Sequence, residues 1–122
     1  MTAITMVRTA VILLAMGALG GVGMALIRLF RSINPPSALA MLHGLLAAAG
    51  ITLLLYATFT AGIPQLANIG LGLLVLAALG GLVLNLKYHS RNALLPRGLM
   101  VGHALLAVIG FVLVLLPAWA GW

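Results

Sequence analysis

Long apolar runs, almost free of charge, constrain this chain more than any other feature. The four runs are roughly Thr9–Phe30, Ser37–Thr58, Leu66–Lys87 and Gly98–Leu116. As a helix rises 1.5 Å per residue, a run of about 22 residues extends roughly 33 Å, enough to cross the hydrocarbon core of a bilayer. Short segments containing proline separate the runs, so consecutive helices should be antiparallel neighbours. The sequence therefore predicts an all-α membrane protein, a four-transmembrane-helix up-down bundle.

Missing residue types restrict the chemistry of this chain. Its 122 residues include no Asp, Glu or Cys, while 65% are hydrophobic. Without carboxylates there is no paired acid–base catalysis and no cation site built from side-chain oxygens. Without cysteine there is no thiol nucleophile, disulfide or iron–sulfur ligand. We therefore expect no catalytic residues in the chain itself, and the net charge of +6 is read as membrane topology rather than nucleic-acid binding.

The positions of the basic residues predict an orientation. The first and third connections and their flanks carry Arg28, Arg31, Lys87, Arg91 and Arg97, whereas the second connection carries no basic residue. The positive-inside rule places connections one and three in the cytoplasm and both termini outside, and we expect a bacterial inner membrane. Phe59, Trp119 and Trp122 would then belong to an aromatic belt on the outer side.

An internal repeat becomes visible when the sequence is shifted by 60 residues. Two copies of ALGG, at 18–21 and 78–81, fall on each other without a gap. The same register aligns Arg31 with Arg91, Pro36 with Pro96, His43 with His103, and Gly50 with Gly110. We therefore expect a single transmembrane domain, 1–122, built from repeat units of about 1–60 and 61–122. Each unit would be a two-helix hairpin, and a pseudo-twofold axis along the membrane normal would relate the two.

Two histidines occupy equivalent places in the repeat, on the second and fourth helices. These helices lie at diagonal corners of a simple four-helix arrangement, so the two imidazoles should lie at equal depth about one axis. Small residues share the face of each histidine at i+4 and i+7. They are Ala47 and Gly50 beside His43, and Ala107 and Gly110 beside His103. Such a flat surface can admit a planar macrocycle or a closely packed helix.

The leading hypothesis for this pair is one b-type haem with His43 and His103 as its two metal ligands. Two neutral imidazoles give a low-spin iron suited to electron transfer, and a bundle core is a common place for such a site. Haem propionates need cations near the membrane interface. Arg28, Arg31, Arg91 and Arg97 are available there. Arg31 and Arg91 are the preferred partners because they are duplicated with the repeat.

The four-helix plan and the two segments LHGLLAAAG and GHALLAVIG give the chain a resemblance to small membrane cytochromes b. It resembles cytochrome b561-like proteins and the haem-bearing anchors of respiratory oxidoreductases. Cytochrome b561 proteins use four histidines for two haems, so the two histidines within these spans would serve one. The resemblance implies electron transfer with a quinone or with a partner redox subunit of a larger membrane complex.

Two other readings of the histidine pair remain open from the sequence. The histidines could form hydrogen bonds between helices and bind no cofactor, in a non-redox accessory subunit of a larger complex. Each could instead bind the magnesium of a (bacterio)chlorophyll, as in antenna-type helices. The glycines of the ALGG segments are expected to serve close helix packing. His89, which has no histidine partner in the repeat, is expected to be a solvated residue at the interface.

Overall fold

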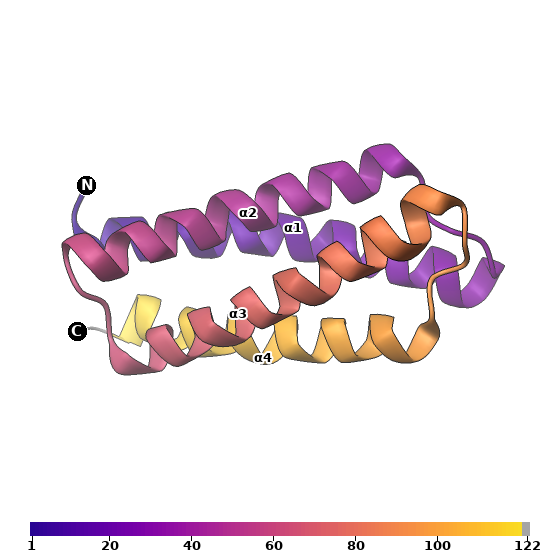
Figure 1. Ribbon diagram of the computed structural model, residues 1–122. Helices are drawn as coiled ribbons and strands as arrows, with labels where there is room; N and C mark the ends of the chain where they lie inside the picture. The colour runs from indigo at the N-terminus through magenta and orange to yellow at the C-terminus, as the bar shows by residue number, and fades with distance from the viewer. Residues whose placement is uncertain (121–122) are drawn as a thin grey trace.

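The computed structural model describes residues 1–120, and these form four long antiparallel helices (Figure 1). The helices are α1 (Ala3–Arg31), α2 (Ser37–Thr60), α3 (Gln65–Val83) and α4 (Arg97–Ala120). A π-helical turn, η1 (Leu84–Tyr88), and a 3-10 turn, η2 (His89–Arg91), extend α3. All four spans are long and apolar enough to cross a membrane, so the predicted all-α membrane bundle is confirmed.

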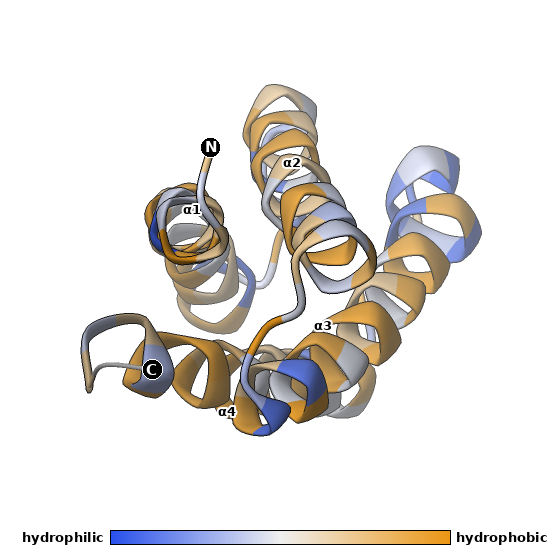
Figure 2. Ribbon diagram, turned by 90° about the vertical axis from the view of Figure 1, so that its left-hand side faces the viewer, coloured by the Kyte–Doolittle hydropathy of each residue, from blue (hydrophilic) through white to orange (hydrophobic). Residues whose placement is uncertain are grey.

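The helices are arranged as two hairpins, α1–α2 and α3–α4 (Figure 1). Both termini and the second connection lie at one end, and connections one and three lie at the other. Viewed along the bundle, hydrophobic residues cover the outward faces as well as the inward ones (Figure 2). A helix that is apolar all round requires an apolar surrounding on every side, which a bilayer provides. The chain is an integral membrane protein.

The helices run further than the apolar runs predict. At the start of α1, the Thr2 hydroxyl accepts from the Thr5 N–H at 3.3 Å, and this cap lets the helix begin at Ala3. At the other end, α4 continues through Pro117 to Ala120. A proline removes one backbone donor and disfavours the helical conformation of the residue before it, which is why an end at Leu116 was expected.

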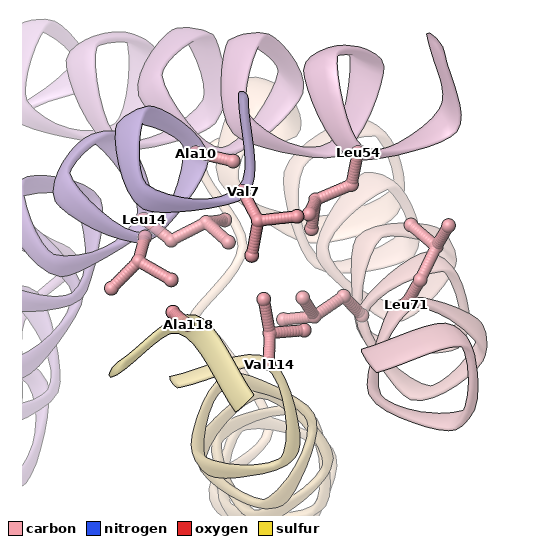
Figure 3. Packing of buried hydrophobic residues seen from close by; sticks show 9 residues of the cluster. Val7, Ala10, Leu14, Leu54, Leu71, Val114 and Ala118 are labelled. Atoms are coloured by element: carbon pink, nitrogen blue, oxygen red, sulfur yellow. The ribbon is translucent and has the colours of Figure 1, made fainter. Parts of the chain in front are cut away.

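The hydrophobic core lies toward the end of the bundle that carries the termini. It draws side chains from all four helices, among them Val7, Leu54, Leu71 and Val114 (Figure 3). The offset of 60 residues relates most of the buried positions in the two hairpins. These pairs are Val7 and Ala67, Ala10 and Gly70, Val11 and Leu71, Leu14 and Leu74, Gly17 and Ala77, Gly50 and Gly110, and Leu54 and Val114.

Polar contacts near the termini follow the same offset. Arg8 donates from Nε to the carbonyl of Ala118 at 2.9 Å and lies 5.6 Å from the centre of the Trp119 ring. In the positions 60 residues away, the Thr58 hydroxyl donates to the Asn68 side-chain oxygen at 3.1 Å. Both contacts join one hairpin to the other. Trp122, the remaining member of the expected aromatic belt, lies outside the described residues.

Asn34 ties the first connection to the third. Its amide nitrogen donates to the Ala93 carbonyl at 2.6 Å, and its amide oxygen accepts from the Leu95 N–H at 3.1 Å. Asn34→Ala removes both bonds, so we expect a loss of about 1–2 kcal/mol in the free energy of unfolding. Unfolding in detergent micelles measures it. Asn85→Ala is the matched control, because Asn85 is exposed and its side chain makes no hydrogen bond to residues 1–120. An equal, small effect of both changes would contradict this role of Asn34.

Candidate functional site: two imidazoles on the bundle axis

His43 is fixed to α1 through its ring nitrogen Nδ1. This atom lies 2.7 Å from the backbone carbonyl oxygen of Gly17. A carbonyl can only accept, so Nδ1 carries the hydrogen and donates it. The proton is thereby placed on Nδ1, and Nε2 keeps its lone pair.

His103 is fixed in the same way in the second hairpin. Its Nδ1 donates to the carbonyl oxygen of Ala77, again at 2.7 Å. Ala77 lies 60 residues after Gly17, as His103 does after His43. Both imidazoles therefore share one tautomer, one orientation relative to their hairpin and one partly buried environment.

Glycines make room for both rings. A Cβ at Gly21 would lie 3.0 Å from Cε1 of His43, and a Cβ at Gly81 would lie 3.1 Å from Cε1 of His103. Each glycine is also four residues after the carbonyl that the histidine bonds, where a helical N–H already donates to that same oxygen. A side chain there would cover the oxygen. The ALGG segments thus expose a second lone pair of a helical carbonyl, in addition to the expected packing role.

The two rings meet across the diagonal of the bundle. Their centres are 6.2 Å apart, and their planes make an angle of 76°. No hydrogen bond joins either Nε2 to any of residues 1–120. The pair thus brings two imidazole Nε2 atoms, on opposite helices, to one level of the bundle.

The bundle is loosely filled at this level. The main core ends near Gly17 and Ala77, and a smaller cluster of Leu84, Leu95 and Met100 lies beyond the histidines. Among the described residues between them, at 18–27, 37–49, 78–83 and 101–109, no side chain is fully buried. An open groove also runs beside His103, along the α4 glycines Gly98 and Gly102. The histidine level therefore separates two packed regions.

Two of the predicted cofactor-contacting residues, Gly50 and Gly110, pack inside their own hairpins. Gly50 faces α1, where a Cβ would lie 2.7 Å from Leu14, and Gly110 faces α3, where it would lie 2.9 Å from the carbonyl of Gly70. Both positions are occupied by the neighbouring helix of the same hairpin. Ala47 and Ala107 are partly buried one turn from the histidines, and Ala47 lies beside Gly17.

The basic residues near the connections differ in their surroundings. Arg31 and Arg91 are exposed, and neither side chain makes a hydrogen bond to residues 1–120. Arg97 lies 3.5 Å from the Ser32 hydroxyl. Arg28 instead is buried, with 7% of its surface exposed, and donates from Nε to the Leu95 carbonyl at 2.9 Å. No sequence feature distinguishes this arginine, which turns inward, from the other three near the connections.

His89 is also corrected, because it is partly buried rather than solvated. Its Nε2 donates to the Pro35 carbonyl at 2.8 Å. The two acceptors, the carbonyls of Pro35 and Leu95, are repeat-equivalent because they are 60 residues apart. Their donors are not, because His89 comes 61 residues after Arg28. The π turn η1 contains one extra residue per turn, which rotates His89 to the place that Tyr88 would take in a regular helix. Each hairpin thus donates one hydrogen bond to the connection of the other, through Arg28 in the first hairpin and His89 in the second.

The donor set restricts which groups could be bound here. Within residues 1–120, no group of three or more His, Cys, Asp or Glu side chains could hold a bare metal ion. Two imidazoles are sufficient ligands for a metal whose other positions are filled by a macrocycle. In comparisons with known proteins, no family model, curated protein or solved structure matches the chain.

Proposed function

We propose that this protein is a b-type cytochrome subunit that carries electrons through one haem held by His43 and His103. The observation that supports it is the convergence of the two imidazoles. A metal ion about 2 Å from each of two ligating nitrogens would separate the ring centres by roughly 6 Å. The centres of these rings are 6.2 Å apart.

The hydrogen bonds to Gly17 and Ala77 support the same proposal. Metal-ligating histidines commonly donate their other ring N–H to a backbone carbonyl, which fixes the tautomer and raises the basicity of the ligating nitrogen. Here both Nδ1 atoms donate at 2.7 Å, which directs both Nε2 lone pairs to the ligand role. When bound, the haem would supply one-electron chemistry, and two neutral imidazoles would keep its iron low-spin and closed to oxygen.

The wider setting is proposed from the same features. The chain has little mass outside its four helices. A partner redox subunit or a membrane quinone would therefore supply and accept the electrons. The chain would lie in a bacterial inner membrane with connections one and three in the cytoplasm, because the basic residues gather at those connections.

A non-redox accessory subunit is the second candidate, and one observation favours it. Each histidine already makes a complete helix-to-helix hydrogen bond inside its own hairpin. Such bonds stabilise membrane bundles by themselves. The two candidates differ in whether the Nε2 atoms bind a metal.

The visible spectrum of the purified protein separates these candidates. The protein is expressed with haem available, purified in mild detergent, and measured oxidised and then reduced. We expect sharp bands of a low-spin b-type haem, at one haem per chain. A colourless protein that stays colourless after incubation with haem would refute haem binding and support the accessory role. An extractable far-red pigment would point to chlorophyll binding instead.

A further inference from the structure

Arg28 is a buried cation in a chain that has no side-chain anion. Only 7% of its surface is exposed, and the sequence contains no Asp or Glu. Buried charges in proteins are paired, because removing an ion from water costs several kcal/mol that only an opposite charge or several hydrogen bonds offset. No side chain of this protein can form that ion pair.

The contacts that Arg28 does make are incomplete. Its Nε donates to Leu95, whose side chain packs with Leu84 and Met100 in an apolar cluster. The carboxyl end of α1 contributes about half a negative charge, shared among its last carbonyls. A guanidinium has five N–H donors, and four of them are on its Nη atoms. Those four make no hydrogen bond within residues 1–120.

The Nη groups remain reachable from outside the protein. In the described part of the chain, no fully buried side-chain nitrogen or oxygen lacks a hydrogen-bond partner. Since the Nη atoms have none, they must account for some of the small exposed area of Arg28. A ligand can therefore contact them without unpacking the Leu84 cluster.

Arg28 also lies in line with the imidazole site. It is seven residues after Gly21, which touches the His43 ring, and eleven after Gly17. Residues seven or eleven apart share a helix face, and seven residues rise about 10 Å. His89 reaches the equivalent place from the other hairpin, two turns beyond the Gly81 that contacts His103.

We propose that Arg28 binds an oxyanion that the chain does not supply, at the connection end of the histidine site. A carboxylate or phosphate would accept two parallel N–H bonds from its guanidinium fork. The anion is a haem propionate, which rests on the proposed function, or else the phosphate of a lipid headgroup. Arg28 thereby replaces Arg31 and Arg91, both exposed, as the residue that receives the anion.

The test changes the ligand as well as the protein. Affinity for haem and for haem dimethyl ester, in which both propionates are esterified, is measured for the wild type, Arg28→Gln and Arg31→Gln. The wild type should prefer haem by about tenfold, as expected for a charge-assisted hydrogen-bonded pair. Arg28→Gln should lose the preference, and Arg31→Gln, an exposed change one turn away, should retain it. The comparison in the wild type does not depend on how the variants fold.

A lipid measurement identifies the other source. The same three proteins are purified from nanodiscs of phosphatidylcholine with and without phosphatidylglycerol, and native mass spectrometry counts retained lipid. Phosphatidylglycerol retained by the wild type and Arg31→Gln, but not by Arg28→Gln, supports a phosphate occupant. If this lipid result is obtained and the protein binds no haem, the proposed function is refuted while the anion site at Arg28 is supported. Equal affinity of the wild type for haem and its ester, with equal lipid retention in all three proteins, would overturn the site.

Discussion

Replacing either His43 or His103 by leucine is expected to abolish the low-spin haem spectrum. In His43→Leu and in His103→Leu the iron would lose one of its two protein ligands. Loss of an outer-shell partner alone typically weakens metal binding about 10–100-fold, and loss of a ligand should cost more. We expect little or no haem at purification, and a high-spin or five-coordinate spectrum from any that remains. Titration of the apoprotein with haem, followed in the visible range, measures the change.

His89→Leu is the matched control for these variants. His89 lies in η2, donates to the Pro35 carbonyl in the first connection, and is not one of the two proposed ligands. Its removal should leave the haem bands unchanged, although the protein should unfold more easily. Six-coordinate, low-spin bands that persist in His43→Leu would contradict ligation by this pair, as would their loss in His89→Leu alone.

Gly70→Ala is expected to destabilise the second hairpin strongly. A Cβ there would lie 2.6 Å from the Gly110 carbonyl oxygen and 2.9 Å from Cγ2 of Val114. The nearest atom belongs to backbone and cannot rotate away, so α3 and α4 must separate. Overpacking of this kind typically costs about 1–3 kcal/mol. Thermal or denaturant unfolding in micelles, scored by loss of helical circular dichroism, measures it.

Gly72→Ala provides a control of opposite sign. Nothing lies within 4 Å of a Cβ built at Gly72. Alanine there should only restrict the unfolded chain, which in a helix stabilises by about 0.5–1 kcal/mol. The position in α1 that is repeat-equivalent to Gly70 is Ala10, which lies against Gly50. A hairpin of this type can therefore accommodate a methyl group there at a wider helix crossing. Equal stability of the two variants would show that α3 and α4 adjust to that wider crossing.

The plan of the bundle was predictable because a bilayer leaves few choices. Long apolar runs must become helices, short connections make them antiparallel, and two hairpins of one sequence place residues 60 apart in equivalent surroundings. These arguments were enough to predict four helices and to direct attention to His43 and His103. They could not provide the ring separation, because that depends on how deeply each helix packs against its neighbour.

The partners of the two histidines were beyond sequence reasoning for a different reason. Their acceptors are the backbone carbonyls of Gly17 and Ala77, and every residue has such a carbonyl. The only available signal was the glycine four residues later in each ALGG segment, which was read as a packing feature. The contact of His89 was missed because the π turn changes the direction of side chains after Leu84, and no residue pattern announced it. The inward direction of Arg28 was missed because it is one of four arginines near the connections, and nothing in its sequence position distinguishes it.

The contacts related by the 60-residue offset have a consequence for how this fold can arise. Gly17 with His43, and Ala77 with His103, lie within the hairpins, whereas Arg8 with Ala118 and Thr58 with Asn68 lie between them. A single hairpin therefore carries both halves of a self-complementary surface, which is the requirement for an isologous dimer. Two identical copies could build this bundle. Joining them in one chain allows the halves to diverge, and only then can one hairpin use Arg28 for a contact that the other makes with His89.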